Sequence, residues 1–280
     1  MFPMKSPRIA FVGGGNMARA LIGGLIGRGT PASQLSVGEP SADARQLLAK
    51  DFKVQVSGDN GAAIDGCELV IVAVKPGEAA TVLGALAPRL QSTRPVLLSV
   101  AAGIQIASLS AWVGAGIAII RTMPNRPALI GAGVTGMYAA PDVTAAHREL
   151  AEATMRAAGH TVWVGRESDL DLVTALSGSG PAYFFLLAEL MMQAAIDQGL
   201  EPQTARQLAV GTLYGAGALA NASDGDLARL REQITSRGGT TEAALGAFAA
   251  ADLRGIVAHA MRAAAQRSRD LAARFGDPTR

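Results

Sequence analysis

Short apolar runs alternate with longer helical stretches over the first part of the chain. Between residues 8 and 164 the runs are rich in β-branched residues, as in "RIAFVG", "QLSVGE", "KVQV", "ELVIVAV", "PVLLSV", "AIIRTM" and "HTVWVG", and the stretches between them are rich in alanine. Apolar strands that alternate with helices are typical of a parallel sheet covered by helices on both faces. The pattern therefore predicts an α/β domain.

The strand pattern ends near residue 165, and only helical periodicity follows it. Helices are predicted at 169–176, 181–198, 202–220, 224–233, 241–250 and 252–274. No Pro- or Ser-rich linker marks the change. We expect two domains, an α/β domain over residues 1–165 and an all-α domain over residues 166–280.

The first predicted strand leads directly into a glycine-rich turn, "FVGGGNMARAL". Gly13, Gly15 and Ala18 match the pattern G-x-G-x-x-[G/A]. Such glycines allow the backbone to approach a pyrophosphate, which the N-terminus of the following helix stabilises. Between a strand and a helix, the motif favours a Rossmann-type doubly wound sheet over a purely structural turn. The candidate cofactor-binding residues here are Gly13, Gly14, Gly15, Asn16 and Met17.

The end of the second predicted strand bears on the choice of cofactor. An acidic residue there holds a ribose 2′-hydroxyl, whereas a cation or a hydroxyl group favours a 2′-phosphate. In "VGEPSADAR", Glu39 argues for NADH, and Ser41 and Arg45 would serve NADPH. A solvated turn without a cofactor role explains the three residues equally well, so the choice between NADPH and NADH stays open.

Later strands end in further candidate residues. Ligands of open α/β sheets lie outside the carboxyl ends of the strands, which places "AVKP", "AAGI" and "RTMPNRPALIGAG" near the cofactor. Two prolines stiffen the last of these loops and place Asn125 on the nicotinamide side, although a rigid structural loop is an equal alternative. The candidate cofactor-binding residues are Asn60, Ala73, Val74, Lys75, Pro76, Ala102, Gly103 and Asn125.

Composition narrows the choice of partners. A net charge of +2 leaves no basic face of the size that nucleic-acid-binding proteins need. The single cysteine, Cys67, permits neither an internal disulfide nor a thiolate metal site, which fits a reducing compartment. The N-terminus lacks the pattern of a signal peptide. We therefore expect a cytoplasmic protein that binds a small molecule and no nucleic acid.

The most apolar helical stretch, "AYFFLLAELMMQAAI", is short for a membrane span and contains Glu189 and Gln193. We interpret it as a buried helix and expect no membrane association. Together with helix 202–220 it carries more apolar surface than a small helical layer buries by itself. This excess predicts a homo-oligomer.

Candidates for general acid/base catalysis are scarce. His147, His160 and His259 lie outside ligand-like turns, and the lysines, at positions 5, 50, 53 and 75, are absent from the helical half. This argues against the β-hydroxyacid dehydrogenases, whose substrate domain supplies a lysine. No His/Cys/Asp cluster has the spacing of a metal site, so no metal is expected.

The helical half contains instead two turns rich in glycine and hydroxyl groups, "LSGSGPAY" and "TSRGGTTEA". Free N–H and hydroxyl groups at such turns make a good receptor for a small carboxylate. Alternatively, Ser179 and Thr241 are ordinary helix caps, each worth about 1 kcal/mol. The candidate substrate-binding residues are Ser177, Gly178, Ser179, Gly180, Ser236, Gly238, Gly239, Thr240 and Thr241.

Five segments in order, "GGGNMARAL", "AVKP", "MPNRPALIGAGVTG", "LSGSGPAYFF" and "TSRGGTT", resemble the pyrroline-5-carboxylate reductase family over about residues 8–274. The resemblance implies reduction of the cyclic imine L-1-pyrroline-5-carboxylate to L-proline by NADPH or NADH, the last step of proline biosynthesis. A cyclic imine reacts as its iminium, so hydride addition needs little beyond orientation and one hydrogen-bonding group. That chemistry accounts for the missing histidine and lysine.

The resemblance also implies individual roles. The turn matching Ser236–Thr241 would hold the substrate carboxylate, and Thr241, the catalytic candidate, would hydrogen-bond the ring nitrogen. It further implies an intertwined homodimer formed through an all-α C-terminal dimerisation domain, assembled into a larger homo-oligomer. Arg237 and Arg126 depart from the family pattern, which usually has proline and a small residue at these positions. The alternatives are a related hydroxy-acid dehydrogenase and a non-catalytic dinucleotide-binding sensor.

Overall fold

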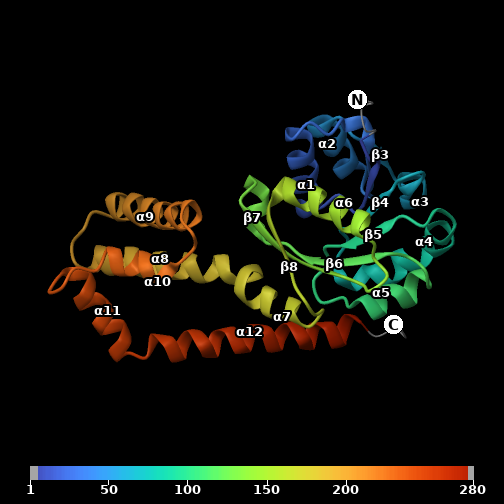
Figure 1. Ribbon diagram of the computed structural model, residues 1–280. Helices are drawn as coiled ribbons and strands as arrows, with labels where there is room; N and C mark the ends of the chain where they lie inside the picture. Colours follow the sequence, from blue (N-terminus) through green and yellow to red (C-terminus); the bar gives the residue numbers. More distant parts are fainter. Residues whose placement is uncertain (1–5, 277–280) are drawn as a thin grey trace. The chain divides into compact units, whose positions relative to one another are not determined.

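A computed structural model describes residues 6–276 of the chain. Its core is one eight-stranded sheet in the order β3-β2-β1-β4-β5-β6-β7-β8 (Figure 1). The strands are β1 (Ile9–Val12), β2 (Leu35–Gly38), β3 (Gln55–Ser57), β4 (Leu69–Val72), β5 (Val96–Ser99), β6 (Ile119–Met123), β7 (Gly133–Ala139) and β8 (Gly159–Trp163). The predicted α/β class with a Rossmann-type sheet and a helical C-terminal part is confirmed.

The expectation of a parallel sheet is wrong at the β6–β7 pair, so that β7 and β8 run opposite to β1–β6. Strands β3 to β6 pair in parallel, but β7 runs antiparallel to β6, with Ile120 opposite Ala139. The sequence analysis missed β7, whose "GVTGMYA" contains glycines that weaken the strand pattern. Close packing explains these glycines, because a Cβ on Gly133 would lie 2.8 Å from the Ala158 carbonyl oxygen and one on Gly136 2.6 Å from Val173.

The apolar strands are buried on both sides by helices. Ile9 and Phe11 face α1 (Asn16–Gly27), α2 (Ala42–Phe52) and α6 (Ala145–Met155), and Ala10 and Val12 face α3 (Asn60–Ile64), α4 (Ala79–Thr93) and α5 (Ile106–Val113). Because successive side chains of a strand point to opposite faces, a continuous apolar run is what such a sheet requires. The remaining short helices of this part are η1 (Ala32–Gln34), η2 (Pro76–Glu78), η3 (Arg126–Ile130) and η4 (Arg156–Ala158).

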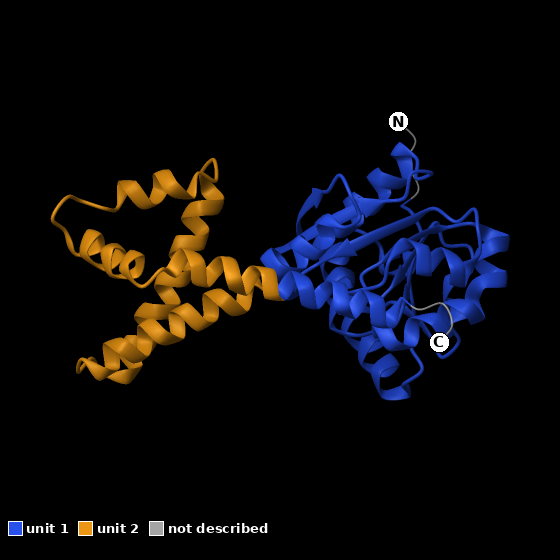
Figure 2. Cartoon of the chain, turned by 90° about the horizontal axis from the view of Figure 1, so that it is seen from below, with its two compact units in different colours: residues 1–178, 264–280 blue, residues 179–263 orange. Residues whose placement is uncertain are grey.

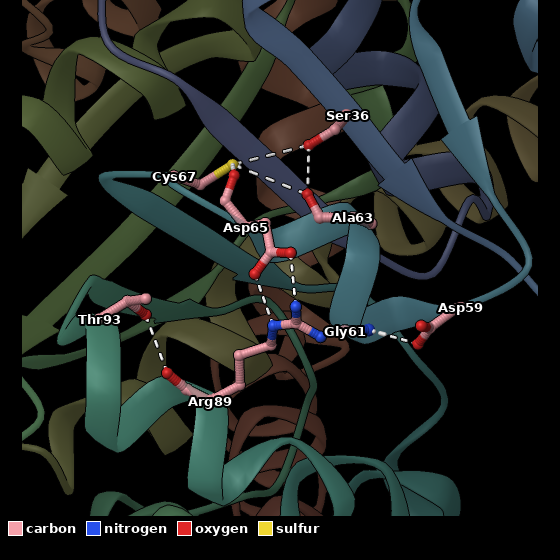
Figure 3. A network of polar contacts seen from close by, with 8 residues as sticks. All are labelled: Ser36, Asp59, Gly61, Ala63, Asp65, Cys67, Arg89 and Thr93. Carbon is pink, nitrogen blue, oxygen red and sulfur yellow. Dashed lines mark hydrogen bonds and ion pairs between the residues drawn. The ribbon is translucent and has the colours of Figure 1, made fainter.

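Polar contacts tie the short helix α3 to its surroundings (Figure 3). Asp59 accepts a hydrogen bond from the Gly61 N–H at 2.8 Å, and the Ser36 hydroxyl donates to the Ala63 carbonyl at 2.6 Å. Asp65 is paired with Arg89 of α4. Burial raises the pKa of the Cys67 thiol next to Ser36. These contacts fix the helix at the ends of β2 and β3.

The chain forms two compact units (Figure 2). Unit 1 comprises residues 1–178 and 264–280, and unit 2 comprises residues 179–263. The sequence-based boundary near 165 lies just after the last strand, whereas the compact units separate at residue 178. Unit 1 therefore includes α7 (Asp169–Val173), a π-helical turn, η5 (Thr174–Gly178), and the end of α12 (Leu253–Phe275).

Unit 2 consists of helices that bury little of their own surface. It contains α8 (Gly180–Asp197), α9 (Pro202–Ala222), α10 (Leu227–Gln233), α11 (Thr240–Ala250) and the start of α12. Helices α8 and α9 pack together, yet Gly180 and Ala205 are their only buried residues. The expectation that α8 is a buried helix is therefore wrong for the single chain, because unit 2 has too few layers to cover it.

Length and composition alone would allow the segment Asp169–Asp197 to cross a membrane. It includes both α7 and α8, and 17% of its most apolar window is buried. Phe184 and Phe185 of α8 are each 61% exposed. An exposed aromatic surface of this kind is also what an interface between protein chains requires.

Candidate functional site

The predicted cofactor residues gather at the carboxyl ends of the central strands. In the sheet, β1 lies between β2 and β4, so the chain order reverses between β1 and β4. Open α/β sheets bind their ligands in the crevice at such a reversal. The glycine turn follows β1, Glu39 follows β2 and Lys75 follows β4, which places all three segments around this crevice.

The glycine turn after β1 has the geometry that a pyrophosphate site needs. Gly13 has φ +99° and donates its N–H to the Gly38 carbonyl at 2.8 Å. A Cβ at Gly13 would lie 2.8 Å from the Ala73 carbonyl oxygen, so a larger residue would push β4 away. Space is open next to Gly15, where a Cβ would meet nothing within 4 Å. The turn thus combines tight backbone packing on one side with free access on the other.

Helix α1 begins directly behind this turn without a side-chain cap. Gly15 occupies the N-cap position, and the first turn contains no acidic residue. The N–H groups at the start of a helix have no partner within the helix, and the helix dipole attracts negative charge. The backbone of Asn16 and Met17 therefore fits a phosphate group, as the sequence predicts.

The next predicted cofactor residues lie at the end of β4. Ala73 donates its N–H to the Val12 carbonyl, which continues the β1–β4 pairing by one residue, and Val74 follows it. Lys75 is exposed and caps η2, in which Pro76 is the first residue. These residues remain predictions as cofactor contacts.

The loop after β5 has a structural reason for its glycine. Gly103 has φ +77°, and a Cβ there would lie 3.5 Å from the backbone of Leu271 and Ala272 in α12. The positive φ thus favours glycine whatever the cofactor needs, whereas the contact with α12 is an ordinary van der Waals distance. Ala102 next to it is exposed and remains a predicted cofactor contact.

Asn60, the first residue of α3, presents an unpaired polar atom. Its amide oxygen is buried and has no hydrogen-bond partner among residues 6–276. A Cβ on Gly38 at the end of β2 would lie 2.2 Å from this oxygen, so glycine is required there. A buried polar atom without a partner is costly, and a donor group on a bound ligand would satisfy it. Asn60 therefore fits a cofactor contact.

Asn125 has a structural role that the sequence analysis offered only as an alternative. Its side chain is 8% exposed. The amide oxygen accepts from the Val134 N–H at 2.9 Å, and the amide nitrogen donates to the Ser177 carbonyl at 3.0 Å. Asn125 therefore joins the loop after β6 to β7 and to the π-helical turn η5. A contact with the nicotinamide remains a prediction.

The first hydroxyl-rich turn, residues 176–183, overlaps the end of this π-helical turn and the start of α8. The Ser177 hydroxyl donates to the Val173 carbonyl at 3.0 Å. A Cβ on Gly178 would lie 2.8 Å from the Met123 side chain. Ser179 is the N-cap residue of α8, but its hydroxyl accepts no capping hydrogen bond, and Gly180 and Pro181 begin the helix. Short π-helical segments are frequent at functional sites.

The second hydroxyl-rich turn, residues 235–241, leads into α11. Gly239, not Thr241, is the N-cap residue, and no side chain caps the helix. Gly238 has φ +74° and donates its N–H to Glu242, while Gly239 donates to the Ser236 carbonyl at 3.0 Å. Thr241 therefore lies in the first turn of α11, and its hydroxyl does not cap the helix. The alternative that Thr241 is an ordinary helix cap thus does not apply.

The hydroxyl groups of the second turn are available to a ligand. Ser236, Thr240 and Thr241 donate no side-chain hydrogen bond to another described residue, whereas the Thr235 hydroxyl donates to the Arg231 carbonyl at 2.6 Å. Arg237 is exposed at the tip of the turn. Hydroxyl groups, helix-start N–H groups and a nearby cation together suit a small carboxylate.

The sequence analysis missed a buried ion pair in unit 1. Arg121 of β6 is 5% exposed and lies 3.0 Å from Glu167, which also accepts from the Ile106 N–H at 2.7 Å. These groups line a cavity of about 780 Å³, together with Gln105, Asp171 and Arg269. The signal was the arginine inside the apolar strand "IIRTM", because a charge in a buried strand requires a partner.

Metal chemistry has no support among the described residues, where no group of three or more His, Cys, Asp or Glu side chains is placed to hold an ion. The ionisable side chains of the two hydroxyl-rich turns are those of Tyr183, Arg237 and Glu242. Hydrogen-bond donors thus dominate both turns.

Comparisons with known proteins cover both parts of the chain. A model of the pyrroline-5-carboxylate reductase dimerisation domain matches residues 167–271, and a model described as coenzyme F420-dependent NADP oxidoreductase matches residues 8–103. The pyrroline-5-carboxylate reductase of Pseudomonas aeruginosa is 44% identical over 98% of this chain and 100% of that protein. The Haemophilus influenzae enzyme is 39% identical over 97% of this chain and 100% of that protein.

Solved structures agree with the sequence relatives. A pyrroline-5-carboxylate reductase from Coxiella burnetii superposes with a TM-score of 0.93 and 35% identity, covering 96% of this chain and 99% of that one. The Plasmodium falciparum enzyme, solved with NADP bound, has a TM-score of 0.82 and 27% identity, covering 96% and 99%. On the identity and coverage of these relatives, the chain belongs to the pyrroline-5-carboxylate reductase family.

Proposed function

We propose that this chain reduces L-1-pyrroline-5-carboxylate to L-proline as the last step of proline biosynthesis. The observation that carries the proposal is 44% identity over essentially full length to an enzyme named for this substrate. The free hydroxyl groups of the turn 235–241 support it, because they offer a carboxylate receptor without a general acid or base.

The residues of unit 1 fit a nicotinamide dinucleotide. The open space at Gly15, the uncapped start of α1 and the unpaired Asn60 amide oxygen provide for its pyrophosphate and adenosine parts. When bound, NADH or NADPH supplies the hydride that adds to the imine carbon. The protein's own task is then to hold the substrate in one orientation and to exclude alternative geometries.

In unit 2, the hydroxyls of Ser236 and Thr240 hold the substrate carboxylate, and Gly238 and Gly239, whose N–H groups are bonded within the turn, shape the backbone around it. The Thr241 hydroxyl hydrogen-bonds the ring nitrogen. When hydride adds to the iminium carbon, the π electron pair of the C=N bond becomes the lone pair of this nitrogen. We also assign Ser177, Gly178, Ser179 and Gly180 to substrate binding. Arg237 adds a positive charge near the carboxylate without touching the reacting atoms.

The chain forms a homodimer through its dimerisation domain. We propose further that the dimers assemble into a larger homo-oligomer, and that the enzyme acts in the cytoplasm without membrane or nucleic-acid partners. The exposed aromatic residues of α8 and α9, which otherwise resemble a membrane-facing surface, are buried between chains in this arrangement.

The decisive experiment is to incubate purified protein with NADH or NADPH and pyrroline-5-carboxylate, follow nicotinamide absorbance and identify the product. Proline formation is the expected result. Oxidation of hydroxy acids with NAD⁺ or NADP⁺ in place of imine reduction would identify a hydroxy-acid dehydrogenase. Cofactor binding without turnover of either substrate class would identify a sensor.

A further inference from the structure

The carboxylate of Glu39 is held at the mouth of the cofactor crevice by backbone donors. One carboxylate oxygen accepts from the Gly14 N–H at 2.9 Å, and the other accepts from the Ser41 N–H at 3.0 Å. The Glu39 N–H is itself bonded to the Ser57 carbonyl at 2.9 Å. Both ends of the residue are thus fixed, and its negative charge lies between the glycine turn and the loop after β2.

This charge has no cation beside it among the described residues. Arg45 lies close in sequence but forms no ion pair with Glu39. Its guanidinium donates instead to the backbone carbonyls of Glu39 and Pro40, at 2.7 and 2.8 Å. The same nitrogen would lie 3.2 Å from a Cβ on Gly58, so Arg45 fills the space between two loops. Arg45 therefore supports the loop from within.

The Ser41 hydroxyl, the candidate for a 2′-phosphate contact, caps a helix with its oxygen and keeps its own O–H able to donate. Ser41 is the N-cap residue of α2, and its hydroxyl accepts from the Ala44 N–H at 3.3 Å. Between Glu39 and Arg45, the only other charged side chain is that of Asp43, which is exposed and acidic. The loop that receives the adenosine ribose in doubly wound folds thus presents a fixed carboxylate, and the one cation of this segment, Arg45, is bonded to backbone carbonyls.

We propose that Glu39 makes this enzyme select NADH over NADPH. A carboxylate accepts hydrogen bonds from ribose hydroxyls, whereas a 2′-phosphate would put a second negative charge beside it. Accommodation of the phosphate would place it beside this fixed carboxylate, while Nη1 of Arg45 stays bonded to two backbone carbonyls. The proposal rests on the proposed function only in that the chain uses a nicotinamide cofactor.

Direct binding tests this proposal without turnover. The dissociation constants of NADH and NADPH are measured by quenching of tryptophan fluorescence, on the wild type and on Glu39→Gln, which keeps the side-chain shape and removes the charge. The wild type should bind NADH at least about tenfold more tightly, a difference of about 1.4 kcal/mol. In Glu39→Gln the ratio should fall at least about tenfold, because NADPH binding improves and NADH binding weakens.

Asp43→Asn is the matched control, since it removes a nearby negative charge at an exposed position in the first turn of α2. Its NADH/NADPH ratio should stay within about twofold of wild type, as expected of a solvent-screened charge. Equal affinity of the wild type for both cofactors would overturn the proposal, and so would an unchanged ratio in Glu39→Gln. If Arg45→Ala selectively lost NADPH binding from a wild type that prefers NADPH, Arg45 would be the selecting residue instead.

The outcome is independent of the imine reaction. A wild type that prefers NADH in binding but does not reduce pyrroline-5-carboxylate would refute the proposed function and leave the role of Glu39 intact. A reductase that binds and consumes NADPH as well as NADH would support the proposed function and refute the role of Glu39. Circular dichroism of each variant establishes that the fold is retained before the ratios are compared.

Discussion

The two compact units differ in how much of their apolar side-chain surface they bury. Unit 1 buries its strands on both faces, with Ile9, Phe11 and Leu69 each at most 1% exposed. Unit 2 leaves Tyr214 79% exposed, and α10 and α11 contain no buried residue. A sheet with helices on both faces buries its own apolar side chains. A few helices of similar composition bury theirs only against another chain. The same apolar content thus produces a self-contained unit in one half and an interface in the other.

The strongest test of this contrast is Phe185→Glu in α8. An exposed aromatic that becomes buried in the dimer is a typical hot spot, so the dimer dissociation constant should rise about a hundredfold. Light scattering measures the assembly, and NADH binding should be retained because the predicted cofactor residues lie in unit 1 and Phe185 lies in unit 2. Gln207→Glu, which adds the same charge on α9 without removing an apolar side chain, is the control. A variant Phe185→Glu that remained dimeric at low protein concentration would contradict this reading of unit 2.

Thr241→Ala sharpens the contrast between cofactor and substrate roles. Loss of one hydrogen bond to the reacting nitrogen should lower kcat at least about tenfold, with the dissociation constant of NADH nearly unchanged. Thr241→Ser should recover much of the loss, since it retains the hydroxyl. Thr235→Ala is the control in the same turn, because its hydroxyl is bonded to the Arg231 carbonyl. Unchanged turnover in Thr241→Ala would remove Thr241 from the mechanism.

Asn125→Leu tests whether the hydrogen bonds of the Asn125 side chain stabilise unit 1. The substitution leaves the Val134 N–H and the Ser177 carbonyl without their partner, which should lower the free energy of unfolding by about 1–3 kcal/mol. Chemical denaturation measures the change, with the exposed neighbour Arg126→Gln as control. If stability were unchanged and NADH affinity fell, Asn125 would be a cofactor contact and not a link between loops.

Arg237→Gln should have the smallest effect. The side chain is exposed, and a solvent-screened charge contributes at most about 1 kcal/mol, so KM for pyrroline-5-carboxylate should rise no more than about fivefold while kcat is retained. Initial-rate kinetics over a range of salt concentrations measure it, and the difference from wild type should shrink as salt increases. A large fall in kcat would mean that Arg237 acts on the reacting atoms.

Most elements of the fold were predictable because their signals are local. The apolar runs gave β1 to β6 and β8, and helical periodicity gave α8, α9, α11 and α12 within a few residues. Strand β7 was not predictable, because its glycines weaken the strand pattern. Glycine is required there by close contacts with Ala158 and Val173, which lie farther along the chain. The exposure of α8 was also misjudged, because burial depends on how many layers surround a helix.

For the site, the sequence by itself determined which residue types stand at the strand ends and in the hydroxyl-rich turns. The glycine motif and the turn 235–241 required only reading along the chain. Only the tertiary structure decided which of these groups are already engaged. Asn125 is bonded to a carbonyl 52 residues away, and Glu39 to an N–H 25 residues away. A hydrogen-bond donor or acceptor is free for a ligand only if no distant residue has taken it, and that depends on packing in three dimensions.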